Sequence, residues 1–292
     1  IAVLRNCKKF NVTSVGMVGS WDNLSKWGLR EQVDKLAVWS SYMKEEALKF
    51  QGYNDKEVEI IGVPQFDHYL EEQYSKEDFY TKFKLDPEKK TIFFGSEGPI
   101  CPDDVYIVKT LQEKIKDGTL EGFQVLVRPH FGYRLDISRF EHLVDRKTVL
   151  IDKLRKDSSF KDGTALDLST ADNLLAQIKF CDAHITSTST LVLDIIAGGK
   201  QPILYRFDED KNKEYKESTK RLYGTLWFKE ILKFKLDNVA DSEGGLVEKV
   251  FEVVKNPKKY EGVREELIKR LCFRVDGKSG VRLFETINLL VN

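Results

Sequence analysis

The chain has 292 residues, of which 41% are hydrophobic and 32% charged, a composition typical of a soluble globular protein. Lysine plus arginine and aspartate plus glutamate both number 47, so the net charge is zero and gives no indication of nucleic-acid binding. Its apolar runs are too short to span a bilayer, and no signal peptide is recognisable. The four cysteines have no metal-site spacing. We therefore expect a cytoplasmic protein with reduced thiols.

Short β-type runs alternate with amphipathic helical runs, which predicts parallel α/β units. In the first part of the chain we expect strands at residues 11–18, 34–39 and 58–63. Ser40 or Ser41 is a suitable cap for a following helix, and Gly52 a suitable end. The segment 66–86 is polar and of helical character, and it is interpreted as a connection between two domains. The opening residues are typical of the middle of a domain, so the first domain is expected to be incomplete at its N-terminus.

The alternation restarts at residue 91. We expect strands at residues 91–95, 123–127, 183–186 and 201–207. Helices are expected at residues 105–118, 171–180, 191–199, 247–256 and 263–271. The stretch 140–167 is interpreted as irregular, and the charged run 208–221 as a solvated loop or lid.

Three loops of the second part follow strands directly: SEGP, RPHF and TSTST. Ligands of parallel α/β sheets bind beyond the carboxyl ends of the strands. Small hydroxyl residues before a helix let backbone N–H groups approach an anion, so Ser189 or Thr190 would meet a phosphate and Asp194 the ribose hydroxyls. Alternatively, these residues only cap the helix. The candidate donor-binding residues are Ser96, Glu97, Gly98, Arg128, His130, Ser187, Thr188, Ser189, Thr190 and Asp194.

Arg128 and His130 come at the end of one expected strand. A guanidinium suits a diphosphate, and a histidine can polarise or protonate a leaving phosphate. Alternatively, His130 has a structural role. The glycine patterns GxxxxGK[ST] and GxGxxG are absent, which argues against a P-loop and against a nicotinamide-binding Rossmann domain.

The loop SWDNLSKWG follows the first expected strand and supplies candidate acceptor-side residues, Ser20, Trp21, Asp22 and Asn23. An aromatic ring with a carboxylate suits a sugar, and Asp22 is the candidate base. Alternatively, the loop is a rigid turn in which Asp22 or Asn23 bonds its own backbone. Two acidic clusters are interpreted without metal: residues 103–104 as helix capping, and residues 208–210 as surface.

In their order, the motifs SWDNL, GVPQFD, FFGSEGP, LVRPHF and STSTLVLD resemble those of the CDP-glycerol glycerophosphotransferase-like and surface-polysaccharide glycosyltransferases of GT-B fold. GVPQFD is similar to the G-x-P-x-x-D hinge between two Rossmann-like domains. STSTLVLD is similar to the donor-binding segment of teichoic-acid polymerases. The resemblance implies that Ser189, Thr190 and Asp194 contact the nucleotide, and Arg128 and His130 its diphosphate. The His-Gly motif of those polymerases is missing, which favours a sugar donor.

The resemblance implies an α/β, GT-B-like fold of two Rossmann-like domains with parallel sheets and a cleft between them. We expect an acceptor-side domain at residues 1–70, a donor-nucleotide domain at 71–265, and a C-terminal helix at 266–292 that can pack back on the first domain. Asp22 and His130 are the expected catalytic residues.

The expected activity is metal-independent transfer of a sugar from a UDP-, CDP-, GDP- or CMP-linked donor to a surface-glycan or lipid-linked acceptor of the cell envelope. No bound cofactor is implied. The enzyme would be cytoplasmic, with peripheral association at the inner face of the membrane as an option. The alternatives are a polyol-phosphate transferase, a nucleotide-sugar 2-epimerase and a non-catalytic glycan-assembly subunit.

Overall fold

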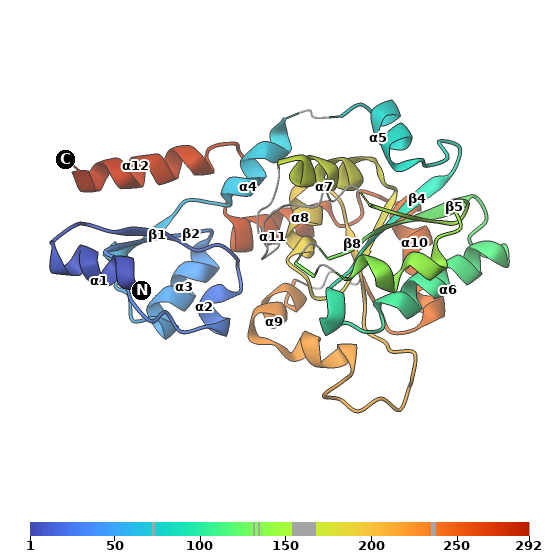
Figure 1. The fold of residues 1–292 in the computed structure, drawn as a ribbon, viewed down its shortest axis with the longest axis horizontal. Helices are drawn as coiled ribbons and strands as arrows, with labels where there is room; N and C mark the ends of the chain where they lie inside the picture. The colour runs from blue at the N-terminus through green and yellow to red at the C-terminus, as the bar shows by residue number, and fades with distance from the viewer. Residues whose placement is uncertain (72–73, 131, 134, 154–167, 235–237, 292) are drawn as a thin grey trace. The chain divides into compact units, whose positions relative to one another are not determined.

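The structure is a computed structural model that describes residues 1–71, 74–130, 132–133, 135–153, 168–234 and 238–291 (Figure 1). The chain divides into two compact units. Unit 1 comprises Ile1–Glu71, Lys229–Lys235 and Gly262–Asn292, and unit 2 comprises Glu72–Phe228 and Leu236–Glu261. Each unit has its own parallel sheet, as the alternation of strand and helix patterns predicts.

Unit 1 is built on a three-stranded sheet. Its strands, in spatial order, are β1 (Val15–Met17), β2 (Lys35–Val38) and β3 (Val58–Ile60). Its helical segments include α1 (Ala2–Lys9), α2 (Asn23–Lys26), α3 (Ser41–Phe50), α4 (Pro64–Asp67), η7 (Ile268–Cys272) and α12 (Ser279–Val291). The strand expected at residues 11–18 forms only over Val15–Met17, and helix α1 was not predicted.

Helix α3 shows how local sequence sets these elements. Ser40 has extended backbone, and its side chain accepts a hydrogen bond from the Met43 N–H at 3.4 Å, which satisfies one of the free donors at the helix start. The helix ends before Gly52, whose φ of 71° is readily adopted only by glycine. Both features confirm the predicted helix limits.

The GVPQFD motif holds α12 within unit 1. The Asp67 carboxylate accepts hydrogen bonds from the backbone N–H groups of Ser279 at 3.0 Å and Gly280 at 2.8 Å, so it satisfies donors at the start of the helix. Arg282 Nε donates to the Ile61 carbonyl oxygen at 2.7 Å. A Cβ on Gly62 would lie 2.7 Å from the Ser279 hydroxyl oxygen, so the close approach requires glycine.

Unit 2 is built on a six-stranded parallel sheet in the order β6-β5-β4-β7-β8-β9. The strands are β4 (Lys90–Gly95), β5 (Phe123–Arg128), β6 (Val149–Ile151), β7 (Ala183–Thr186), β8 (Pro202–Tyr205) and β9 (Val239–Ala240). The α-helices are α5 (Lys76–Phe83), α6 (Asp104–Lys116), α7 (Leu168–Phe180), α8 (Leu191–Ala197) and α10 (Glu243–Lys255). Helices α9 (Leu226–Leu232) and α11 (Glu261–Leu267) cross the limits between the units.

Two apolar layers bury the sheet of unit 2. One layer joins α6 and α10 to side chains such as Phe94 and Tyr205, and the other joins α5 and α7 to Phe93. Phe79 and Phe83 of α5 are part of this second layer. Segment 66–86 is therefore more than the predicted connection, because α5 belongs to the core of unit 2.

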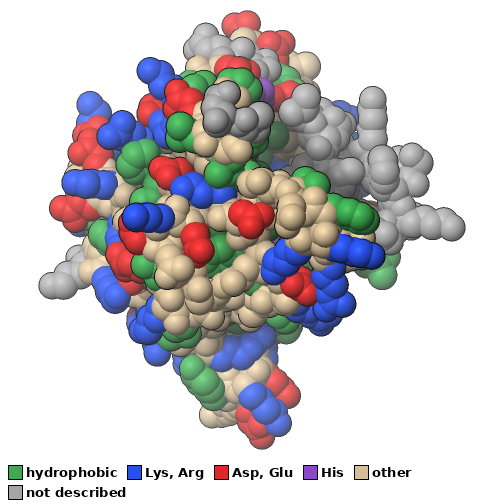
Figure 2. All heavy atoms as spheres, turned by 90° about the vertical axis from the view of Figure 1, so that its left-hand side faces the viewer, with side chains coloured by type: hydrophobic (Ala, Val, Ile, Leu, Met, Phe, Trp, Pro, Cys, Tyr) green, Lys and Arg blue, Asp and Glu red, His purple; other side chains and the backbone are tan. Residues whose placement is uncertain are grey.

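Acidic and basic side chains are interspersed over the face shown in Figure 2, in agreement with the zero net charge. In the part of the chain that the structure describes, no helix combines the length and apolar character needed to cross a membrane.

Candidate functional site

The sheet of unit 2 has a switch point between β4 and β7. From β4 the chain proceeds outward to β5 and β6, then returns to pair β7 with the other side of β4 before adding β8 and β9. All of these strands are parallel, so their carboxyl ends lie along one edge. Ligands of open α/β sheets bind in the crevice outside such a switch point. The loops after β4 and β7 are therefore the candidate donor site.

These two loops contact one another. The Thr186 hydroxyl donates to the Gly95 carbonyl oxygen at 3.0 Å, and the Cys101 thiol donates to the Ser187 hydroxyl oxygen at 3.5 Å. A Cβ on Gly95 would lie only 2.1 Å from Cδ2 of Leu191, at the start of α8. Glycine at the end of β4 therefore lets α8 approach this edge of the sheet.

The loop after β4 is organised by the buried carboxylate of Asp104. Its Oδ2 accepts hydrogen bonds from the Ser96 hydroxyl and the Glu97 N–H, both at 2.8 Å, and Tyr205 donates to Oδ1. Burial raises the pKa of Asp104 to about 7, although hydrogen bonds from Tyr205 and Ser96 favour its ionised form. This residue fixes the shape of the loop, a role that the sequence analysis missed.

The interpretation of residues 103–104 as helix-capping side chains is wrong. Asp103 is the N-cap residue of α6, but its side chain makes no capping hydrogen bond. It accepts instead from Lys213 and, at 3.4 Å, from the Glu209 N–H. Asp104 bonds the preceding loop rather than its own helix. Both carboxylates therefore bind loops at the carboxyl edge of the sheet.

Gly98 completes the loop after β4. Its φ is 73°, a left-handed conformation that side chains disfavour, and a Cβ would lie 2.4 Å from Cδ2 of Tyr133. The Gly98 N–H donates to the Ser96 hydroxyl oxygen at 3.0 Å. The Ser96 hydroxyl therefore donates to Asp104 and accepts from Gly98, so its present contacts are within the protein.

The loop after β7 carries the hydroxyl residues expected at the donor. Ser187 and Thr188 are buried. The Ser189 hydroxyl accepts from the Leu191 N–H at 3.3 Å, whereas Thr190, the N-cap residue of α8, makes no capping bond with its side chain. Asp194, in α8, is 8% exposed. Helix capping thus accounts for Ser189, and contacts of this loop with a nucleotide stay a prediction.

Arg128 lies at the end of β5 but is engaged by protein groups. Its guanidinium donates to Asp152 at 3.1 Å, to Gln177 at 3.1 Å and to the Thr170 carbonyl oxygen at 3.2 Å. These contacts join the ends of β5 and β6 to α7. They give Arg128 a structural role, and its expected contact with a diphosphate stays a prediction.

His130 is held in a defined orientation. Its backbone N–H donates to Asp136 at 2.7 Å, and its Nδ1 accepts from the Gly132 N–H at 3.0 Å. The neutral ring therefore carries its hydrogen on Nε2. The Tyr133 ring centroid lies 4.8 Å away. The expected contact of this imidazole with a diphosphate stays a prediction.

In unit 1 the loop after β1 forms a local turn. The Ser20 hydroxyl donates to the Asp22 carboxylate at 2.7 Å, and the Ser20 N–H donates to the Asn23 side chain at 3.1 Å. Lys26 pairs with Asp22 at 3.3 Å. This is the rigid-turn alternative of the sequence analysis. Trp21 is 1% exposed, so its ring belongs to the core, and its expected contact with an acceptor stays a prediction.

Glu46 is a buried carboxyl that the sequence analysis missed. It lies in α3 and is 4% exposed, and its Oε2 has no hydrogen-bond partner among the described residues. Burial raises its pKa, and a hydrogen bond from Tyr42 partly offsets this rise, while the charge of Asp22 adds to it. A carboxyl whose pKa is raised in this way is a candidate proton donor or acceptor.

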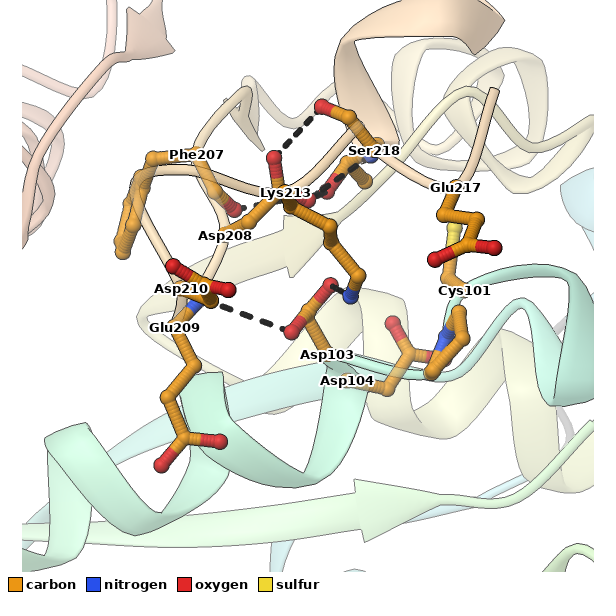
Figure 3. A network of polar contacts seen from close by, with 12 residues as sticks. Cys101, Asp103, Asp104, Phe207, Asp208, Glu209, Asp210, Lys213, Glu217 and Ser218 are labelled. Atoms are coloured by element: carbon orange, nitrogen blue, oxygen red, sulfur yellow. Dashed lines mark hydrogen bonds and ion pairs between the residues drawn. The ribbon is translucent and has the colours of Figure 1, made fainter. Parts of the chain in front are cut away.

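The charged run after β8 is anchored at both ends. Asp208 is 8% exposed, and its carboxylate accepts hydrogen bonds from the hydroxyls of Ser218 and Thr219. It also accepts one from the backbone N–H of Thr219 at 2.8 Å. Lys213 pairs with Asp103 (Figure 3). The surface interpretation of residues 208–210 is therefore wrong for Asp208, whose carboxylate closes the loop. Across the described residues, no group of three or more His, Cys, Asp or Glu is arranged to hold a metal ion.

Comparison with known proteins supports the fold. No protein-family model matches the chain. Over 106 residues it is 35% identical to a processive diacylglycerol beta-glucosyltransferase of Bacillus licheniformis, a match that covers 36% of this chain and 25% of that protein. The wall teichoic acid polymerase TagF superposes with a TM-score of 0.57 at 17% identity, over 92% of this chain and 60% of that one. The chain thus spans less than two thirds of both proteins.

A third protein superposes over a larger share of its own length. The UDP-GlcNAc 2-epimerase of Methanocaldococcus jannaschii gives a TM-score of 0.60 at 14% identity, over 99% of this chain and 73% of the epimerase. The predicted GT-B-like fold is confirmed. At these identities the solved structures establish the fold alone. The polymerase and the epimerase both share this fold, to which the parallel sheet of unit 2 and its switch point belong.

Proposed function

We propose that unit 2 binds the nucleotide of an activated sugar donor, and that the protein transfers this sugar to a surface-glycan or lipid-linked acceptor of the cell envelope. The observation that carries the proposal is the position of the hydroxyl-rich loop 187–190 beside the loop of Ser96 and Gly98, at the β4/β7 switch point. The partial match to a glucosyltransferase adds support.

Donor binding is assigned to groups at this edge. Backbone N–H groups of Ser189 and Thr190 would approach a phosphate, Asp194 would accept from the ribose hydroxyls, and Glu97 would line the opposite loop. The Nε2–H of His130 would donate to an oxygen of the diphosphate. These assignments require no metal, because N–H donors and cationic side chains can stabilise the leaving diphosphate.

The reaction would displace the nucleoside diphosphate at the donor sugar carbon. The acceptor oxygen bonds to that carbon, the bond from carbon to phosphate oxygen breaks, and the acceptor proton passes to a carboxylate. Asp22 and Glu46 of unit 1 are the candidates for this base. We keep Asp22 as the candidate base, because the Glu46 oxygen that has no hydrogen-bond partner among the described residues is buried. We propose that the protein works in the cytoplasm, next to the inner face of the membrane.

Thermal unfolding with UDP, CDP, GDP and CMP tests the proposal. A ligand that binds only the native state at 100 times its Kd adds about 2.7 kcal/mol of stability. For a domain of this size, that corresponds to a rise in melting temperature of roughly 5–10 °C. We expect one of the four nucleotides to give such a shift. If none of them shifts the transition at millimolar concentration, the donor-site proposal is wrong.

A nucleotide-sugar 2-epimerase is the second candidate, favoured by the larger share of both chains in the epimerase superposition. Incubation with UDP-GlcNAc in the absence of any acceptor separates the two functions. Formation of the 2-epimer would establish the epimerase, and sugar transfer that needs an added acceptor would establish the transferase. Transfer of glycerol phosphate from CDP-glycerol would instead favour the polyol-phosphate reaction. Nucleotide binding without any turnover in the full protein would favour a non-catalytic subunit.

A further inference from the structure

The charged segment after β8 reaches the loop that follows β4. Lys213 contacts Asp103, and Arg221 contacts the Ile100 carbonyl oxygen. Figure 3 shows the beginning of this segment, from Phe207 to Ser218, beside Cys101 and Asp103. Because β7 lies between β4 and β8 in the sheet, the segment and the β4 loop meet over the carboxyl end of β7. That position is at the carboxyl edge of the sheet, next to the switch point.

Tyr223 gives independent evidence for this placement. It lies in the short helix η6 (Thr219–Gly224), and its hydroxyl donates to the Tyr205 carbonyl oxygen at the end of β8. Burial raises the pKa of Tyr223 well above its usual value. Helix η6, which also contains Arg221, is therefore held at the end of β8.

The charge of Arg221 is not offset by a carboxylate. Its guanidinium donates to the carbonyl oxygens of Ser218 at 2.8 Å, Glu217 at 3.3 Å and Ile100 at 2.9 Å. No Asp or Glu of the described residues pairs with it within 4.0 Å. Among the described residues, the Nε–H group of Arg221 and one of its two Nη2–H groups also have no acceptor. The neutral carbonyl oxygens fix the position of the group but leave its positive charge uncompensated.

The other described arginines at this edge each pair with a carboxylate. The pairs are Arg128 with Asp152 at 3.1 Å, Arg139 with Asp136 at 2.6 Å, and Arg206 with Asp241 at 2.7 Å. Lys213 is likewise paired with Asp103. A cation held by uncharged acceptors beside a candidate anion site is suited to bind an anionic ligand, because binding breaks no ion pair.

We propose that Arg221 is a binding residue for the diphosphate of the nucleotide donor, which it meets with Nε–H and Nη2–H at the carboxyl edge of the sheet beside the loop that follows β4. This inference rests on the proposed function, since it names a ligand contact of the same site. The charged segment after β8 would then contribute to donor binding. Arg221, rather than Arg128, would supply the positive charge to the diphosphate, because Arg128 is already paired with Asp152.

The test compares Arg221→Gln and Arg221→Lys with the matched control Arg206→Gln, in which the arginine removed is already paired with Asp241. Titration calorimetry measures the Kd of the nucleoside diphosphate that stabilises the wild type most, and of its monophosphate. We expect Arg221→Gln to weaken diphosphate binding at least tenfold and monophosphate binding less. Arg221→Lys should retain part of the affinity, and Arg206→Gln should stay within twofold of the wild type.

Melting temperatures of the ligand-free variants separate binding from folding. If Arg221→Gln unfolds at a lower temperature but, measured well below that temperature, binds the diphosphate as tightly as the wild type, Arg221 is structural and the inference is overturned. An equal loss of affinity in the Arg206→Gln control would overturn it as well. If the wild type binds none of the nucleotides, the proposed function itself fails, and this inference fails with it.

Discussion

Replacing Asp104 by asparagine should change how the stability of unit 2 depends on pH. The Asp104 carboxyl is fully buried, and its pKa is raised from 3.8 to about 7. Between these pH values the folded protein holds a proton that the unfolded chain has lost, so stability falls as pH rises through this window. A difference of about 3 pK units corresponds to up to about 4 kcal/mol. Asparagine resembles the protonated acid and cannot ionise.

Urea unfolding of the wild type and Asp104→Asn at pH 5, 6, 7 and 8 measures the effect. The stability of the variant relative to the wild type should increase with pH up to about pH 7 and then level off. A constant offset from altered hydrogen bonds with Ser96 or Tyr205 does not affect this slope. A difference that stays flat from pH 5 to pH 8 would show that Asp104 titrates normally, and the account of a buried, proton-binding carboxyl would be refuted.

Asp145→Asn is a control of opposite sign. Burial disfavours ionised Asp145, but hydrogen bonds from Thr148, Lys147 and Val149 outweigh it and hold the pKa of this carboxyl well below its usual range. Its stabilisation is therefore present above about pH 4 and is lost as pH falls below that value. Asp145→Asn should destabilise the protein by a constant amount from pH 5 to pH 8.

Three further predictions concern the donor site. Chelator should leave nucleotide binding unchanged, and a loss restored by magnesium or manganese would exclude the metal-independent mechanism. Asp194→Asn should weaken nucleotide binding by about 1–3 kcal/mol with an unchanged melting temperature of the ligand-free protein; lower stability with normal affinity would remove Asp194 from the site. Gly98→Ala should cost at least ~1 kcal/mol in urea unfolding, from its positive φ alone, and an unaffected midpoint would contradict the close contact with Tyr133.

The fold was largely predictable because local rules dominate in its longer elements. The apolar runs of β4 and β5 are buried at nearly every position, as expected for the inner strands of a parallel sheet. Strands β6 and β9, with three and two residues, are too short to give a periodic signal, and pairing with a neighbouring strand defines them. Helix α5 was predicted as a connection because its polar residues hide Phe79 and Phe83, whose burial depends on the tertiary fold.

The site was only partly predictable for a related reason. A strand followed by small hydroxyl residues marks the β7 loop from sequence alone, since that pattern depends on neighbours in the chain. The partners of Arg128 are distant in sequence: it pairs with Asp152 and donates a hydrogen bond to Gln177. The same holds for Asp104, whose partner Tyr205 is 101 residues away. Side-chain pairing across loops therefore decides which charges are available to a ligand, and spacing cannot reveal it.

The most direct test of the central claim is a crystal structure of the protein with the nucleoside diphosphate that stabilises it most. We predict that the diphosphate lies between the loop of Ser96 and Gly98 and the loop of Ser189 and Thr190, outside the carboxyl ends of β4 and β7. A nucleotide bound in unit 2 at the opposite edge of the sheet, or bound only to unit 1, would contradict the assignment of the switch point as the donor site.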